Sequence, residues 1–132
     1  VQYLLDRYGK GQLQPAPGTP EHAIYLQWSW FAESTFARPL GEIVNHRRVF
    51  GDAAREDAIR EMQDRSHLCM EAIDPLVANQ PFLLGDTFSA ADIMMGYSLL
   101  LASRMAPTAD YPNTQAYWAR LQERPGCAVA IA

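Results

Sequence analysis

The chain has 132 residues, of which 48% are hydrophobic and 20% are charged, and its net charge is −4. This length suits one globular domain with its own core, and the composition excludes an intrinsically disordered chain. The acidic balance argues against a nucleic-acid partner, since the one basic cluster is the short run 46–48. No apolar run approaches the roughly 18 residues that a bilayer span needs, so no membrane partner is expected.

The first element predicted is the end of a helix over residues 1–9, closed by Gly9 as a left-handed cap. Residues 10–19 are rich in proline and glycine, which is typical of a linker. The start of the first helix is not in the sequence. We therefore expect residues 1–9 to end a preceding unit and residues 20–132 to form the domain itself.

A long helix is predicted next, from about residue 20 to about residue 46. Its start is marked because Thr19 is a capping residue, Pro20 suits the first helical position and Glu21 places an acid in the first turn. Pro39 lies inside the pattern, so we expect a kink there. The side chains that recur at steps of three and four are Tyr25, Trp28, Phe31, Ala32, Thr35 and Phe36.

A second long helix is predicted after Gly51, with Asp52 as its cap and an end near Pro75 and residues 79–81. One narrow seam of this helix suits lengthwise packing on another helix. The seam residues are Ile59, Met62, Ser66, Cys69, Ile73 and Leu76.

The strongest local signal lies in residues 82–96. Ser89 is a good helix cap, and Asp92, three residues later, can reach back to its backbone amide, which makes a capping box. We assign Ser89 and Asp92 this structural role rather than a catalytic one. The helix that follows is apolar nearly all round and is expected to be central and buried, ending near Arg104.

A last helix is predicted from near Asn113 to Pro125, and no segment shows convincing strand alternation. The fold class is therefore all-α, a helical bundle of about five helices around residues 89–105.

No metal site is expected, because the histidines have no ligand spacing with one another or with the two cysteines. Cys69 lies on the buried seam and is expected to be an inert thiol, and Cys127 has no partner at a paired spacing. Cysteines of this kind favour reduced thiols and a cytoplasmic location.

The order of these features resembles the C-terminal domain of the cytosolic glutathione transferases, of the bacterial type. The segment YLLDRYG is similar to the end of the last helix of that family's thioredoxin-like domain. The segment QWSWFAES resembles the first long helix of the family's helical domain. The segment FLLGDTFSAAD resembles its helix-capping segment, and YPNTQAYWARLQERP resembles its closing helix. The resemblance covers essentially the whole chain, and the capping segment is its most specific part.

The resemblance implies a two-domain parent enzyme. Its N-terminal domain would hold the co-substrate glutathione and activate the thiolate, which attacks an apolar electrophile. This chain would line the electrophile site and contribute to a homodimer, with no catalytic residue of its own. We expect the missing thioredoxin-like domain and a small apolar electrophile as its other partners. Alone, the chain is expected to bind no glutathione and to be inactive.

The resemblance also places substrate-binding residues on the first long helix. Trp30, Glu33, Ser34 and Arg38 occupy the part that faces the substrate cleft in relatives. The alternatives for these residues are a core aromatic, a solvated face and a dimer contact. Ala37 stands where some bacterial relatives carry a histidine near the glutathione, which argues against that bacterial class.

Two other functions stay open from the sequence. One is a non-catalytic interaction module, as in the similar domains attached to translation factors and aminoacyl-tRNA synthetases. The other is a stand-alone ligand-binding bundle. Without a preceding domain, apolar side chains among Tyr3, Leu4, Leu5 and Trp30 should be exposed, and a symmetric dimer is expected to cover them.

Overall fold

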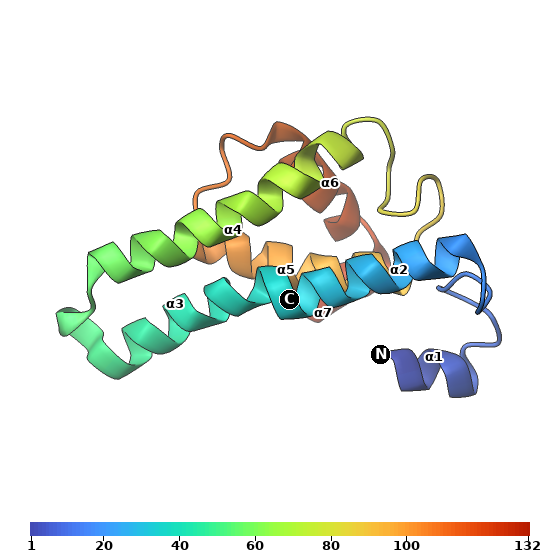
Figure 1. Ribbon diagram of the computed structural model, residues 1–132, viewed down its shortest axis with the longest axis horizontal. Coiled ribbons are helices and arrows are strands. Elements are labelled where there is room, and N and C mark those ends of the chain that lie inside the picture. Colours follow the sequence, from blue (N-terminus) through green and yellow to red (C-terminus); the bar gives the residue numbers. More distant parts are fainter.

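The computed structural model describes residues 1–132 and contains only helices and irregular segments (Figure 1). The all-α class is therefore confirmed. The α-helices are α1 (Gln2–Tyr8), α2 (Pro20–Trp30), α3 (Ala37–Phe50), α4 (Glu56–Val77), α5 (Ala90–Met105), α6 (Pro112–Gln122) and α7 (Pro125–Ile131). None of them is long and apolar enough to cross a membrane.

The first long helix runs without a break from α2 through a π-helical turn, η1 (Phe31–Phe36), into α3. It starts as predicted, with the Thr19 hydroxyl accepting a hydrogen bond from the backbone N–H of His22 at 3.2 Å. In the turn, the N–H of Ala37 bonds to the carbonyl of Ala32, five residues back. A proline ring at position 39 crowds the preceding helical turn, and the wider π turn relieves such crowding. The irregularity expected at Pro39 thus lies just ahead of it.

Two predicted helix boundaries are wrong. Gly9 has φ −72°, a right-handed value, and the left-handed residues are Lys10 and Gly11 just beyond it. Asp52 caps no helix, because it lies in a short 3₁₀ turn, η2 (Gly51–Ala53), and α4 begins only after Arg55. Gly51, at φ 50°, permits the tight reversal that makes room for this extra turn.

The end of α4 lies between Pro75 and residues 79–81, as predicted. The helix includes Pro75 and ends at Val77. Proline removes one backbone donor near the end of a long helix, and the burial of Ile73 and Val77 on either side holds the last turn in place.

Helix α5 lies at the centre of the bundle, against α2, η1 and α3 (Figure 1). The Ser98 hydroxyl on α5 donates to the carbonyl of Ala32 in the π turn at 2.8 Å. One face of α5 departs from the expected full burial, since Ile93 is 47% exposed and Tyr97 is 56% exposed. The largest fully buried side chains of the protein include Tyr25, Phe36, Leu40, Met70, Ile73, Met95 and Tyr117.

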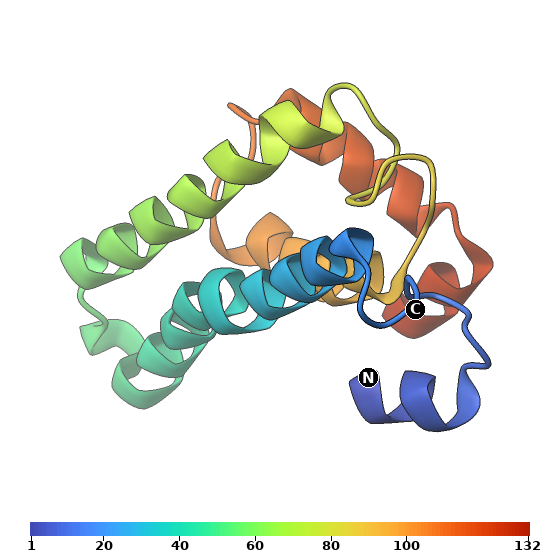
Figure 2. The same cartoon turned by 45° about the vertical axis from the view of Figure 1, so that its right-hand side comes forward.

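Helix α1 lies apart from the bundle and is joined to it by residues 10–19 (Figure 2). It is nonetheless held in place, because the Tyr25 hydroxyl donates to the Gln2 side chain at 3.0 Å and Leu5 packs against the core. Its outer face leaves Tyr3 and Leu4 exposed, as expected.

Candidate functional site

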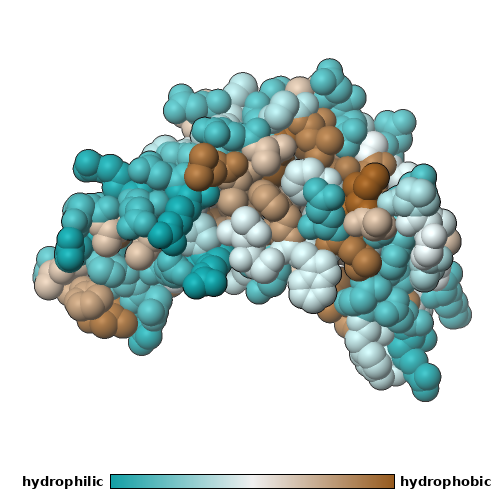
Figure 3. Space-filling view, in the orientation of Figure 1, coloured by the Kyte–Doolittle hydropathy of each residue, from teal (hydrophilic) through white to brown (hydrophobic).

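The π turn and α3 face α4 across a groove, which we call the α3–α4 groove. Helices α3 and α4 are in contact and form an antiparallel hairpin that is closed at one end by η2 (Figure 1). Figure 3 shows hydrophilic side chains over much of the hairpin, with hydrophobic ones in the recess between α4 and α2. The groove has a volume of about 390 Å³, and its lining residues are Phe31, Ser34, Thr35, Arg38, Pro39, Glu42, Arg65, Leu68 and Cys69.

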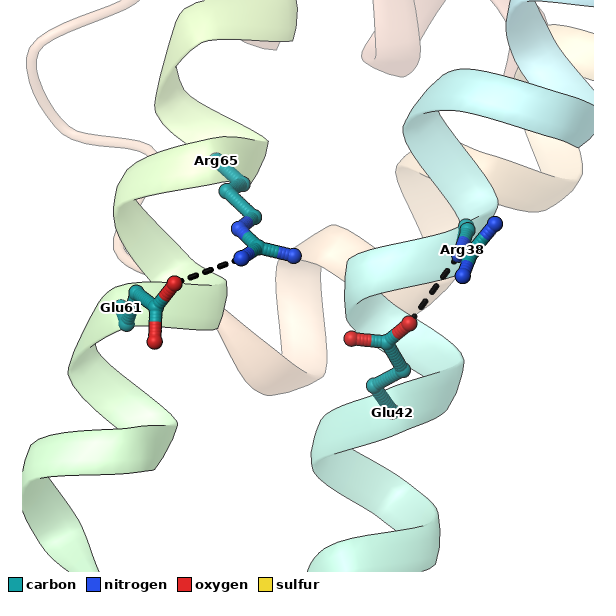
Figure 4. Close-up of polar contacts among 4 residues, drawn as sticks. All are labelled: Arg38, Glu42, Glu61 and Arg65. Atoms are coloured by element: carbon teal, nitrogen blue, oxygen red, sulfur yellow. Dashed lines mark hydrogen bonds and ion pairs between the residues drawn. The ribbon is translucent and has the colours of Figure 1, made fainter.

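Two ion pairs flank the groove, one on each helix (Figure 4). On α3 the Nε of Arg38 lies 3.1 Å from Oε1 of Glu42, and on α4 Arg65 pairs with Glu61. Each pair joins residues four apart on one helix, a spacing that favours such contacts. The pairs are exposed to water, so they stabilise the fold little and leave both guanidinium groups accessible from the groove.

The four substrate-site residues predicted from the sequence separate into two groups. Ser34 and Arg38 line the α3–α4 groove, whereas Trp30 and Glu33 do not. Trp30 is 67% exposed, so it is not a core residue of this chain. The Ser34 hydroxyl donates to the Trp30 carbonyl at 2.6 Å, which leaves the lone pairs of its oxygen available to accept.

The groove also contains residues that the sequence did not single out as site residues. Arg65 and Leu68 come from α4. Only the packing of α3 on α4 brings them opposite Ser34 and Arg38, so no local pattern could have identified them. Cys69 lies at the base, and burial raises the pKa of its thiol to about 11, which keeps it neutral near pH 7.

A second polar cluster, the capping network, comprises Leu83, Ser89, Asp92 and Tyr117. The capping box is present: the Ser89 N–H donates to Oδ2 of Asp92 at 2.8 Å, and the Ser89 hydroxyl accepts from the backbone at the start of α5. The other carboxylate oxygen accepts from the Leu83 N–H at 2.9 Å and from the Tyr117 hydroxyl at 2.7 Å. Asp92 therefore joins three segments of chain.

The capping network is closed to solvent. Asp92 is 1% exposed, and each of its oxygens has two hydrogen-bond donors. Burial, together with the nearby Asp92 charge, raises the pKa of Tyr117 well above its usual value, so this hydroxyl stays a donor. A carboxylate so fully occupied has no free lone pair directed at a ligand, which identifies the network as structural.

Comparison with known proteins gives a consistent result. A family profile described as glutathione S-transferase, C-terminal domain, matches residues 40–125. A glutathione S-transferase of Arabidopsis thaliana, PM239X14, is 28% identical over 127 residues. That match covers 89% of this chain and 57% of the plant protein, so the chain spans less than two thirds of this relative's length.

Solved structures show the same fold. The glutathione transferase URE2P6 from Phanerochaete chrysosporium, in complex with oxidized glutathione, superposes with a TM-score of 0.84 at 24% identity. This match covers 97% of the present chain and 60% of the fungal one. A sphingomonad glutathione S-transferase complexed with glutathione gives 0.81 at 23% identity, covering 99% and 63% of the two chains. At these identities the likeness shows the fold alone.

Proposed function

The chain belongs to the family of glutathione S-transferase C-terminal domains, and from this we propose that it is the electrophile-binding half of a glutathione transferase. In this proposal residues 1–9 end a thioredoxin-like domain, residues 10–19 connect the two domains, and residues 20–132 form the helical half. The full protein would transfer the glutathione thiolate to a small apolar electrophile.

The observation that carries the proposal is the composition of the α3–α4 groove. Each side of the groove contributes an apolar side chain, Phe31 from the π turn and Leu68 from α4. The rim carries the Ser34 hydroxyl and the Arg38 guanidinium. Ligand sites commonly combine apolar walls with a few polar groups that set orientation. Such a groove suits an apolar molecule that also carries an anionic or hydrogen-bonding group.

The chemistry assigned to this chain is positioning rather than activation. Conjugation requires a thiolate, and Cys69 is buried with a raised pKa, so it is a poor candidate for a nucleophile at neutral pH. The groove would hold the electrophilic carbon near the glutathione sulfur. Orientation of this kind lowers the barrier because the reacting atoms are already brought together.

Assembly is the second part of the proposal. The exposed apolar side chains Tyr3, Leu4 and Trp30 are costly to leave in water, and a preceding domain or a second copy would cover them. We assign a homodimer to the full protein. Both cysteines are free thiols, which suits a reducing, cytoplasmic compartment.

The test is a conjugation assay on the full-length gene product with glutathione and an aryl halide. Ser34→Ala and Arg38→Ala are expected to raise the KM for the aryl halide several-fold, because they remove the polar groups of the groove rim. Arg60→Ala is the matched control, since Arg60 is an exposed arginine of α4 outside the groove. Unchanged kinetics in both groove variants would contradict the groove assignment.

The same assay separates the alternative function. A full-length product that forms no conjugate but co-purifies in a defined assembly would favour the non-catalytic interaction module. The 132-residue chain by itself is expected to form no conjugate, because the residues that would activate glutathione lie on the other domain.

A further inference from the structure

The basic run 46–48, the one basic cluster of the sequence, has no part in the α3–α4 groove. It lies in the last turns of α3, just before the chain reverses through η2 into α4. We call residues 44–60, at this end of the hairpin, the hairpin tip. In Figures 1 and 2 the hairpin tip lies far from both chain ends.

Two arginines of the hairpin tip are held by neutral groups. The Arg48 guanidinium donates from Nη2 to Oδ1 of Asn45 at 2.8 Å, and Nη1 of Arg47 lies 4.0 Å from Sδ of Met105. These contacts position the two guanidinium groups without cancelling their charge. The arginines that pair with a carboxylate are, by contrast, Arg38, Arg55 and Arg65.

The end of α5 adds a further arginine to this region. Met105 is the last residue of α5, so its contact with Arg47 brings the last turns of α3 and α5 together. Arg104, in that turn of α5, is exposed and has no carboxylate within 4.0 Å. The hairpin tip and residues 101–105 hold five arginines and three acids, whereas the whole chain has a net charge of −4. This end of the bundle is therefore positive in a chain that is negative elsewhere.

Exposed apolar side chains lie beside these arginines. Val49 is 57% exposed and Phe50 is 52% exposed, and Figure 3 shows hydrophobic side chains gathered at this end of the hairpin. The His46 ring lies 4.7 Å from the Phe50 ring, centre to centre, and its Nε2 accepts from the Arg55 N–H at 3.0 Å. Phe50 is thus held in place by a residue that is itself fixed to the turn. Arginine and aromatic residues are enriched at the centres of protein–protein interfaces.

The amount of positive charge indicates the class of partner. Proteins that grip nucleic acid commonly neutralise about 6–10 phosphates, more than these arginines can reach. A net charge of −4 also repels a long polyanion or an anionic membrane as a whole. A short peptide segment with a few carboxylates avoids that repulsion, and the planar guanidinium group matches the geometry of a carboxylate.

We infer that the hairpin tip binds an acidic segment of another protein. Carboxylates of that segment pair with Arg47 and Arg48, and one of its apolar side chains packs on Phe50. The inference does not depend on conjugation chemistry or on the α3–α4 groove. Because the surface is small, the complex is weak and transient.

The test is fluorescence anisotropy of the full-length gene product with a labelled peptide of sequence EDFEDLEDFEDL. The control peptide, SQFSQLSQFSQL, keeps the apolar side chains and lacks the carboxylates. The acidic peptide is expected to bind about tenfold tighter or more, and its affinity should fall as the salt concentration rises from about 50 mM to about 500 mM. Equal affinities for the two peptides, or no binding of either, would overturn the inference. Tighter binding of a poly-dT oligonucleotide or of phosphatidylserine vesicles would also overturn it, since it would identify a surface for polyanions.

Matched variants of the full-length product locate the binding surface. Arg48→Glu is expected to weaken binding of the acidic peptide about fivefold to tenfold, because it places a carboxylate opposite those of the peptide. Arg7→Glu makes the same change of charge on α1, at the other end of the molecule (Figure 1), and should change the affinity less than about twofold. Equal weakening by the two variants would mean that net charge alone matters, and it would overturn the inference.

The apolar part of the contact has its own pair of variants. Phe50→Ala is expected to weaken binding several-fold, and Phe50→Leu, which keeps a large apolar side chain, should retain most of the affinity. Thermal unfolding followed by circular dichroism verifies that each variant is folded. Unchanged affinity in Phe50→Ala would overturn the assignment of this surface.

Discussion

The capping network and the ion pairs of the α3–α4 groove are both polar, and they differ in where their charges lie. In the capping network Asp92 is buried and joins α5, α6 and the segment before α5. In the groove the Arg38 side chain is 75% exposed, and its carboxylate partner is on the same helix. Water competes with the second kind of contact and is excluded from the first.

This difference separates residues that hold the fold from residues that are available for binding. A buried acceptor with several donors cannot be removed without leaving those donors unpaired, whereas an exposed pair is replaced by water. Substitutions should therefore affect stability in proportion to burial and to the number of segments joined. The groove residues should affect ligand kinetics and leave the free energy of unfolding almost unchanged.

The largest effect is expected for Asp92→Ala. Four groups would lose their acceptor inside the protein: the Leu83 N–H, the Ser89 N–H, the Ser89 hydroxyl and the Tyr117 hydroxyl. Since each unpaired buried donor costs about 1–3 kcal/mol, the free energy of unfolding should fall by about 3–5 kcal/mol. Urea denaturation followed by circular dichroism measures this change.

Asp92→Asn is the matched control, because it keeps the shape and one acceptor oxygen while turning two donors toward the neighbouring N–H groups. It should lose less than the alanine variant. A loss below 1 kcal/mol for Asp92→Ala would show that the buried network contributes no more to the free energy of unfolding than the exposed ion pairs. The proposed difference between the capping network and the groove would then be wrong.

An intermediate effect is expected for Asp74→Ala. This half-buried carboxylate on α4 accepts from the Thr114 N–H at 2.7 Å and from the Asn113 side chain at 2.8 Å, so it caps α6 from another helix. The expected loss is about 1–2 kcal/mol, as for other helix caps. Thermal unfolding at neutral pH checks it.

The pH dependence of this variant gives a second check. Burial acts to raise the pKa of Asp74, but the hydrogen bonds from Thr114 and Asn113 prevail and lower it. The wild type should therefore keep its advantage over Asp74→Ala above about pH 4 and lose it as the pH falls through the lowered native pKa. An advantage that stays constant down to pH 2 would rule out the ionised cap.

A smaller effect is expected for Tyr117→Phe, which removes one hydrogen bond from the capping network and should cost about 1 kcal/mol at neutral pH. Because the pKa of Tyr117 is raised in the native state, folding opposes its ionisation, and its contribution is lost as the pH rises above about 10. The gap between wild type and variant should narrow from pH 8 to pH 11. A gap that widens with pH would contradict the buried, neutral hydroxyl.

These regions also show how far the sequence could be interpreted alone. The Ser89–Asp92 capping box was predictable because both partners lie within four residues of each other. Its links to Leu83 and Tyr117 were not, because they depend on how α6 packs on α5; the capping box alone predicts a loss of only about 1–2 kcal/mol for Asp92→Ala. Likewise, the periodic pattern of the first long helix was enough to place Ser34 and Arg38 on that helix. The position of Arg65 opposite them depends on how α3 packs on α4, which the sequence does not show.

The smallest effect is expected for the Arg38–Glu42 pair, and it decides whether the groove is free for binding. In a double-mutant cycle of Arg38→Ala and Glu42→Ala, the coupling energy should be about 0.3–0.5 kcal/mol at low salt and should approach zero at 1 M salt. Each single variant should change the free energy of unfolding by less than about 0.5 kcal/mol, because water replaces the lost partner of an exposed charge. Urea denaturation at both salt concentrations measures the free energy of unfolding of the wild type, the two single variants and the double variant. A coupling energy above 1 kcal/mol that stays unchanged at 1 M salt would mean that the pair is a structural contact like the capping network. Arg38 would then stabilise the fold and would not be available to bind a ligand.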